Sequence, residues 1–255
     1  MTRELTYDEL LGGRLKMWQP QDGPKVSMDT VLLASWVRVR ARHIKFLELG
    51  AASGAVSLML ALRFPSVDVT GIEIQGDLVD TAIKNRDING ISERVSFLEG
   101  DLRDTSLFPA QSFDGIAVNP PYETKERGRV SPVESRAIAR HGADTCSVED
   151  VAKAACRWLK DRGRLFAIFR ADRMASFIDA MLACLLVPKR LRMIYPKANK
   201  PAKLFLIECV KRADISESAR DGLTIEPSLT VYGDGDEYTP ELLAEYEKAA
   251  GRDAS

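Results

Sequence analysis

The run Asn119-Pro120-Pro121-Tyr122 combines residue types that could bind a planar amino group. Pro120 and Pro121 have fixed φ angles and no backbone N–H, and each restricts the residue before it to extended geometry. The turn is therefore stiff, and it presents two acceptors, the Asn119 side-chain oxygen and the Pro120 carbonyl, beside the Tyr122 ring. Fixed acceptors and a flat aromatic face suit a planar group that carries an NH2. A tight turn that merely ends a strand is the alternative.

A second set of residues could hold a nucleoside cofactor. The run Glu48-Leu49-Gly50-Ala51-Ala52-Ser53-Gly54 contains glycines that let the backbone pass close to a ligand. A carboxylate at Glu73 could accept ribose hydroxyls, and one at Asp101 could accept from an adenine amino group. A Gly-x-x-x-Gly turn alone often reflects only packing. The prediction of a cofactor site therefore depends on the combination of this turn with Glu73 and Asp101. The predicted cofactor-binding residues are Glu48, Gly50, Ala52, Gly54, Glu73, Ile74, Asp101, Leu102 and Asn119.

The elements that must position both sets follow from the apolar runs. From residue 46, short β-rich runs alternate with segments of helical spacing, which predicts a parallel sheet covered by helices on both faces. Strands are expected at 46–49, 67–74, 95–99, 113–118, 164–169, 190–195 and 203–210, with the last two pairing antiparallel. Helices are expected at 54–63, 77–89 (capped by Asp77 and ended at Gly90), 148–159 and 172–185. The predicted fold class is α/β, a Rossmann-like, seven-stranded, mostly parallel sheet with an antiparallel C-terminal hairpin.

Ligands of such sheets bind at the carboxyl ends of the strands. That rule places residues 48–54, Glu73, Asp101 and residues 119–122 on one edge. Around this core, residues 41–212, we expect an N-terminal appendage (1–40) and a C-terminal extension (213–255) packed on or near it. The long polar stretch 123–145 is typical of a lid or recognition loop.

The composition favours a soluble globular protein, with 45% hydrophobic and 29% charged residues in a chain of 255. No run approaches the ~20 apolar residues of a membrane span, and no signal-peptide pattern follows Met1, so a cytoplasmic location and no membrane partner are expected. Four cysteines without Cys-x-x-Cys spacing predict reduced, mostly buried thiols. With two histidines besides, no metal site is expected.

The net charge of −1 hides an uneven distribution. Residues 189–212 contain eight basic side chains against Glu208 alone, residues 38–45 form a second basic cluster, and residues 221–247 are acidic. A local basic face can attract nucleic acid even when the total charge is near zero. An ordinary solvated surface is the alternative.

A nicotinamide-dependent dehydrogenase also ends its second strand with an acid, but it needs Gly-x-Gly-x-x-Gly, and here Gly50 is followed by Ala52 and Ala55. Residues 48–54 instead resemble the first motif of class I S-adenosylmethionine-dependent methyltransferases, with Ala52 replacing the usual middle glycine. Asn119-Pro120-Pro121-Tyr122 resembles the signature of enzymes that methylate planar amino nitrogens. The resemblance implies S-adenosylmethionine as cofactor, S-adenosylhomocysteine as product, and residues 119–122 as the catalytic set.

Flanking segments narrow this resemblance. Trp18-Gln19-Pro20 and residues 25–36 are similar to the N-terminal segment of bacterial tRNA1(Val) adenine-N6 methyltransferases, which modify adenosine 37 beside the anticodon. Residues 137–141 and 195–203 also match that family. The resemblance implies methyl transfer to the exocyclic N6 of an adenine in RNA, with the anticodon loop of a tRNA as partner.

An adenine amino nitrogen is a poor nucleophile because its lone pair is delocalised into the ring. Hydrogen bonds to Asn119 and to the Pro120 carbonyl would favour a more tetrahedral nitrogen, and Tyr122 would stack on the base. Three alternatives stay open: a protein glutamine-N5 methyltransferase, whose carboxamide substrate fits the same acceptors, a non-catalytic RNA-binding protein on the same fold, and a DNA adenine methyltransferase, although the sequence has no inserted target-recognition domain.

Overall fold

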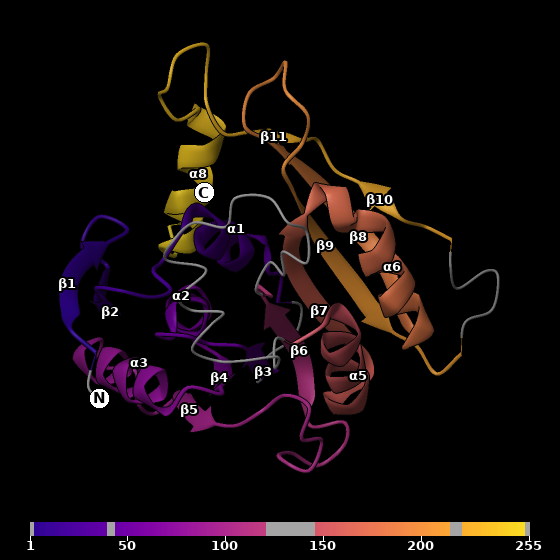
Figure 1. The fold of residues 1–255 in the computed structure, drawn as a ribbon, viewed down its shortest axis with the longest axis horizontal. Coiled ribbons are helices and arrows are strands. Elements are labelled where there is room, and N and C mark those ends of the chain that lie inside the picture. The colour runs from indigo at the N-terminus through magenta and orange to yellow at the C-terminus, as the bar shows by residue number, and fades with distance from the viewer. Residues whose placement is uncertain (1–2, 40–43, 121–145, 215–220, 253–255) are drawn as a thin grey trace.

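The computed structural model describes residues 3–39, 44–120, 146–214 and 221–252 (Figure 1). The strands are β1 (Leu5–Leu10), β2 (Leu15–Pro20), β3 (Ile44–Leu49), β4 (Val67–Glu73), β5 (Val95–Glu99), β6 (Phe113–Val118), β7 (Leu159–Arg170), β8 (Leu186–Tyr195), β9 (Leu204–Lys211), β10 (Thr224–Ile225) and β11 (Leu229–Thr230). The helices are α1 (Met28–Trp36), α2 (Ala55–Arg63), α3 (Gly76–Ile88), α5 (Val148–Trp158), the 3₁₀ turn η1 (Ala171–Arg173), α6 (Met174–Ala183) and α8 (Pro240–Ala249).

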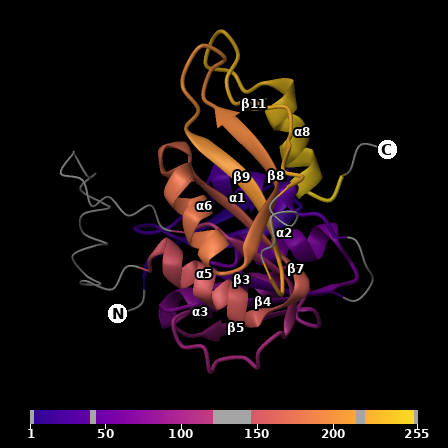
Figure 2. The ribbon, with the colours of Figure 1, turned by 90° about the vertical axis from the view of Figure 1, so that its right-hand side faces the viewer.

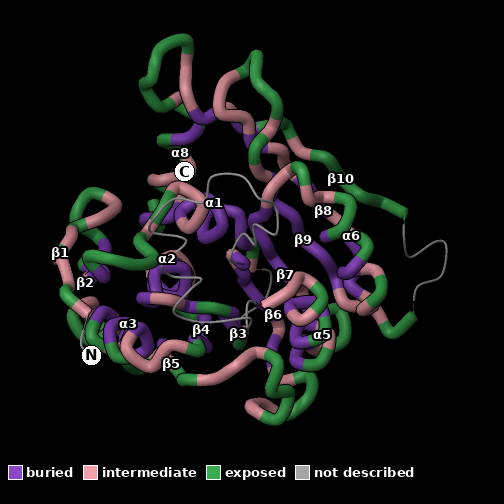
Figure 3. Tube along the Cα trace, in the orientation of Figure 1, coloured by how far each residue is buried: buried purple, intermediate pink, exposed green. Residues whose placement is uncertain are grey.

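One nine-stranded sheet forms the centre of the molecule, in the order β10-β8-β9-β7-β6-β3-β4-β5, with β11 also on β8. Strands β5, β4, β3, β6 and β7 run parallel, whereas β9 is antiparallel to both of its neighbours. Successive strand residues face opposite sides. On β3, Phe46 therefore joins the hydrophobic cluster of α1, α2 and α8, and Leu47 joins that of α5 and α6. Figure 2 shows α6 and α8 on opposite sides of β8 and β9, and Figure 3 shows the buried centre.

The predicted α/β fold is confirmed, while its elements differ from the prediction in several places, among them the number of strands in the sheet and one helix cap. The sheet has nine strands rather than seven, because the short strands β10 and β11 from the C-terminal extension add to β8. Two residues are too few to show a strand periodicity in the sequence. The predicted Asp77 cap is also wrong: α3 begins one residue earlier, with Gln75 at its N-cap, while the Asp77 carboxylate pairs with Arg3 at 2.5 Å.

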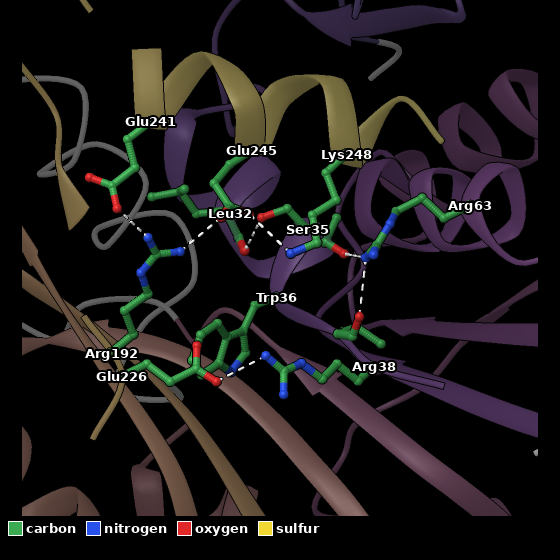
Figure 4. A network of polar contacts seen from close by, with 12 residues as sticks. Leu32, Ser35, Trp36, Arg38, Arg63, Arg192, Glu226, Glu241, Glu245 and Lys248 are labelled. Carbon is green, nitrogen blue, oxygen red and sulfur yellow. Dashed lines mark hydrogen bonds and ion pairs between the residues drawn. The ribbon is translucent and has the colours of Figure 1, made fainter. Parts of the chain in front are cut away.

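Both ends of the chain pack on this core. The N-terminal hairpin β1–β2 lies against α3, and α1 lies between α2 and α8 with Leu32 and Leu33 fully buried. On the C-terminal side, Arg192 of β8 pairs with Glu241 at 2.6 Å and with Glu245 at 2.8 Å, both on α8 (Figure 4). The extension therefore lies on the core, while the domain boundaries at residues 40 and 212 stay a prediction.

The expectation for the cysteines is only partly confirmed. All four cysteines are free thiols, but only Cys209 is buried, so the expectation of mostly buried thiols is wrong for Cys146, Cys156 and Cys184, which are half-buried. Among the described helices, none has the length and apolar character needed to cross a bilayer. Within the same residues, no group of three or more His, Cys, Asp or Glu side chains could hold a metal ion.

Candidate active site

The strand register brings the predicted site residues to one edge of the sheet. Leu49 of β3 lies beside Ile72 of β4 and Val118 of β6, and Glu73 lies beside Glu99 of β5. Because these strands are parallel, the residues that follow them share the carboxyl edge. Adjacent strands lie ~4.8 Å apart, so the three steps from β5 to β6 span about 14 Å. This edge carries Gly50, Ala52, Gly54, Glu73, Ile74, Asp101, Leu102, Asn119 and Pro120; Pro121 and Tyr122 lie outside the described residues.

The turn between β3 and α2 uses its two glycines differently. Gly50 has φ +70° and a Cβ there would meet no atom within 4 Å, so its backbone faces open space. At Gly54, φ is +88° and a Cβ would lie 2.5 Å from the Phe97 ring, so this glycine is required by packing. Ala52 between them has φ +45°, a left-handed conformation that is uncommon outside glycine. The turn thus leaves its backbone accessible beside Gly50.

Glu48 supports this turn from the sheet. Helix α2 has Gly54 at its N-cap, which offers no side-chain acceptor, and Glu48 Oε2 accepts from the Ser57 N–H at 2.8 Å and the Ser57 hydroxyl at 2.5 Å. Glu48 is buried, and this burial raises the pKa of its carboxyl to about 8; bonds from Ser57 oppose the shift and the charge of Glu73 adds to it. The visible contact of Glu48 is with α2, and a direct contact with a cofactor stays a prediction.

Glu73 is held at the end of β4 with one acceptor position left open. Its Oε2 accepts from the Ala52 N–H at 2.9 Å, and its Oε1 accepts from the Gln75 N–H at 3.1 Å and from Gln75 Nε2 at 3.3 Å. A carboxylate offers about four acceptor positions, so three are in use and the remaining one is on Oε2. Glu73 is 7% exposed, which concentrates its charge at a nearly dry site.

Asp101 follows β5 in a loop and is held by its neighbour. Arg103 contacts the carboxylate through Nε at 2.9 Å and through a terminal nitrogen at 2.5 Å. These hydrogen bonds hold the pKa of Asp101 below its usual range. The side chain remains about one-third exposed, so the ionised carboxylate is also accessible from the carboxyl edge.

Asn119 carries an acceptor without a partner among the described residues. Its Oδ1 is buried and receives no hydrogen bond from them, whereas buried polar atoms in folded proteins nearly always have a partner. Leaving such an atom unsatisfied costs about 1–3 kcal/mol, a cost that a bound donor would remove. Asn119 follows β6 directly, and Val118 pairs with Leu49, so the residues Asn119 and Gly50 follow neighbouring strands at the carboxyl edge.

Three residues near this edge were not singled out in the sequence. Asn85 of α3 is fully buried and donates to the Ser53 carbonyl at 3.0 Å and the Trp18 carbonyl at 2.9 Å, so it ties the cofactor turn to the N-terminal hairpin. Gln75 contacts Glu73, and Arg3 contacts Gln75. Asn85 could have been identified from the sequence, because it is a polar residue on the inner face of the amphipathic 77–89 pattern. No sequence feature pointed to Arg3.

The basic segment 189–212 does not form the single face that its sequence suggests. Strands β8 and β9 pair antiparallel, with Ile194 opposite Leu204 and Leu186 opposite Lys211, so the segment is split between the two edges of the sheet. Lys200 and Lys203 are exposed on the carboxyl edge, because Leu204 pairs with Arg170 at the end of β7. Lys189, Lys211 and Arg212 lie toward the other edge.

Acidic residues also neutralise part of this segment. Buried Arg190 pairs with Glu208 at 2.7 Å and with Glu226 at 3.2 Å, and its guanidinium lies 3.6 Å from the centre of the Trp36 ring. In the second basic cluster, Arg38 also pairs with Glu226, at 2.9 Å (Figure 4); residues 40–43 lie outside the described part of the chain. Charge counted along the sequence therefore overstates the basic surface.

Sequence comparison links the chain to known enzymes. Residues 41–184 match the methyltransferase-domain family. The chain is 31% identical over 227 residues to the tRNA1(Val) (adenine(37)-N6)-methyltransferase of Porphyromonas gingivalis, covering 86% of each chain. It is 32% identical over 212 residues to the enzyme of that name from Phocaeicola vulgatus, covering 82% of this chain and 86% of the relative.

Solved structures share the fold. A predicted O-methyltransferase from Agrobacterium tumefaciens superimposes with a TM-score of 0.68 at 24% identity, over 89% of this chain and 98% of that one. Geranyl diphosphate C-methyltransferase from Streptomyces coelicolor, solved with S-adenosyl-L-homocysteine, gives 0.50 at 14% identity, over 68% and 74% of the two chains. With the carboxyl-edge geometry and the sequence relatives, these matches lead to one assignment. The chain belongs to the tRNA1(Val) (adenine(37)-N6)-methyltransferase family of methyltransferases.

Proposed function

We propose that this protein transfers a methyl group from S-adenosylmethionine to the exocyclic N6 of adenosine 37 in the anticodon loop of a tRNA. The observation that carries the proposal is the buried Oδ1 of Asn119, which has no hydrogen-bond partner in the described part of the chain and belongs to the same carboxyl edge as Gly50. An adenine amino group offers the donor that this atom lacks. The names of the sequence relatives support tRNA as the substrate.

The carboxyl edge fits the cofactor. Glu73 Oε2 has a free acceptor position for a ribose hydroxyl, and the accessible Asp101 carboxylate can accept from the adenine amino group. Ile74, which is 52% exposed, offers an apolar surface between these two carboxylates for the base. At Gly50, the absence of a side chain leaves room for the methionine moiety of S-adenosylmethionine. When bound, S-adenosylmethionine supplies an electrophilic methyl group on its sulfonium.

Asn119 and Pro120 orient and polarise the nucleophile. The two N–H groups of adenine N6 donate to Asn119 Oδ1 and to the Pro120 carbonyl, which favours a more tetrahedral nitrogen with an available lone pair. These two acceptors would hold the nitrogen while it accepts the methyl group in exchange for the sulfur–carbon bond, and the proton that it then loses would pass to solvent. The resemblance implies two further roles for residues that lie outside the described part of the chain: Tyr122 would stack on the base, and Pro121 would stiffen the turn. The effect is preorganised hydrogen bonding and alignment.

The RNA reaches this edge from the side of β8 and β9. Lys200 and Lys203 are exposed there and have no acidic partner within 4 Å among the described residues, so they can contact phosphates. The target base has to leave its stack to enter the pocket. An anticodon-loop base is already single stranded, which lowers that cost.

Methyl transfer to an unmodified tRNA1(Val) transcript tests the proposal. The purified protein with S-adenosylmethionine is expected to place one methyl group on adenosine 37, located by mass mapping of nucleosides and fragments. A transcript with guanosine at position 37 is the matched control, and a glutamine-containing peptide tests the N5-glutamine alternative. Methylation of the peptide alone would overturn the RNA assignment, and cofactor binding without any transfer would favour the non-catalytic alternative.

A further inference from the structure

Gln75 connects the predicted ribose-binding carboxylate to the N-terminal segment. Its backbone N–H and its Nε2 both donate to Glu73 Oε1, at 3.1 and 3.3 Å. Its amide oxygen accepts from a terminal nitrogen of Arg3 at 2.6 Å, and Arg3 Nε pairs with Asp77 at 2.5 Å. The chain of contacts runs from Arg3 through Gln75 to Glu73 and ends at the Ala52 N–H in the cofactor turn.

Arg3 determines which way the Gln75 amide points. A guanidinium has only donors, so the oxygen of the amide must face Arg3 and its NH2 group must face Glu73. If the amide were reversed, NH2 would meet the guanidinium and oxygen would meet the carboxylate, with two repulsive contacts. The orientation of Gln75, and through it that of Glu73, is therefore fixed from the N-terminal segment, 72 residues away along the chain.

We propose that Gln75 is a positioning residue for cofactor recognition, held in place by Arg3. By occupying Glu73 Oε1, it turns the carboxylate so that the open acceptor position on Oε2 faces the ribose. The inference rests on the proposed function, because it takes Glu73 as the ribose ligand. Gln75 itself need not touch the cofactor.

The test is the affinity of Gln75→Ala for S-adenosylhomocysteine and for its 2′-deoxyribose analogue, measured by calorimetry. Loss of one such hydrogen bond is expected to weaken S-adenosylhomocysteine about three- to tenfold. The preference for the ribose form over the deoxyribose form should be smaller in Gln75→Ala than in the wild type by a similar factor. A Glu73 carboxylate that is free to rotate would make a weaker hydrogen bond with the ribose hydroxyl. Turnover at saturating cofactor should stay close to that of the wild type.

Two further variants keep the test interpretable. Gln75 is the N-cap of α3 but makes no side-chain capping bond, so Gln75→Ala should melt close to the wild type; exposed Gln21→Ala is the matched control and should change neither affinity. Arg3→Ala should reproduce part of the lost ribose preference without touching Gln75. An unchanged ribose preference in both Gln75→Ala and Arg3→Ala overturns the inference. Failure of the wild type to bind S-adenosylhomocysteine at all would instead overturn the proposed function.

Discussion

The carboxyl edge of β3 to β6 and the basic segment 189–212 behave in opposite ways. Residues of the first are scattered over 73 positions, from Glu48 to Pro120, and the fold brings them together. Residues of the second are contiguous, and the fold separates them onto two edges of the sheet. The difference follows from strand direction. Parallel strands joined by crossover helices have all their carboxyl ends at one edge of the sheet. In an antiparallel hairpin, the loop lies at one edge and both free strand ends lie at the opposite edge.

This comparison shows when spacing in the sequence predicts a functional surface. A motif after a parallel strand has a known location, because the ligand-binding edge of the sheet is a property of the topology. A run of like charges has no such location until the pairing of its strands and its acidic partners are known. The acidic stretch 221–247 provides Glu226, Glu241 and Glu245 as partners for the basic segments.

The largest effect is expected at Asn119, where the proposed function places the target amino group at the carboxyl edge. Asn119→Ala removes one acceptor from the target amino group and should lower single-turnover methyl transfer by about 10²–10³-fold, on the scale of one lost oxyanion-hole donor. Cofactor and RNA affinities should change much less, because the bond strengthens as the nitrogen becomes tetrahedral. A lowered melting temperature with more than half of the wild-type turnover would assign Asn119 to the turn alone.

Glu73→Ala should weaken S-adenosylhomocysteine at least about tenfold, because hydrogen bonds to a charged group contribute about 1.5–3 kcal/mol. Calorimetric titration measures the loss. The nearby exposed Glu99→Ala serves as a control for charge at this edge. If Glu73→Ala bound S-adenosylhomocysteine as tightly as the wild type, Glu73 would not belong to the cofactor site. The carboxyl edge would then no longer be a place where the fold gathers distant functional residues.

The two edges of the basic segment can be separated by matched charge reversals. Lys200→Glu with Lys203→Glu, on the carboxyl edge, should weaken tRNA binding and make the slope of log affinity against log salt less steep by about 2. Arg212→Glu combined with Arg162→Glu, a β7 residue outside the segment but toward the same opposite edge, makes the same charge change and should have a much smaller effect. Equal effects would show that only total charge matters, and a salt-independent affinity would count against an RNA substrate.

The smallest effect concerns Glu48, which lies beneath the edge that Glu73 faces. Its folded-state pKa, about 8, is above the ordinary value of 4.5 for a free glutamate, so the stability that it contributes is full below about pH 4.5 and is lost as the pH rises through 8. Between pH 5 and 9, the melting temperature of Glu48→Gln should therefore rise relative to the wild type, by about 2–4 °C for each 1 kcal/mol.

The control for this prediction is Glu149→Gln, an exposed glutamate in the first turn of α5. Its melting temperature should follow that of the wild type across the same pH range. A constant difference between Glu48→Gln and the wild type would show that Glu48 titrates normally. Cofactor titration of the same variant separates a role in capping α2 from a direct contact with the cofactor.

Patterns along the chain were enough to predict the alternation of strands and helices, the edge where ligands are expected, and Glu73, Asp101 and Asn119 as candidates, because local periodicity and the parallel-sheet rule apply to the linear sequence. The partners of these groups, in contrast, become known only from the folded chain. Neither the unsatisfied Asn119 Oδ1 nor the capping contact of Glu48 with Ser57 follows from spacing in the sequence, and the bond from Arg3 to Gln75 joins residues 72 positions apart. The division of the basic segment between two edges also becomes known only from the fold. Whether a strand is parallel or antiparallel depends on the strand with which it pairs, and the sequence of one strand does not specify this.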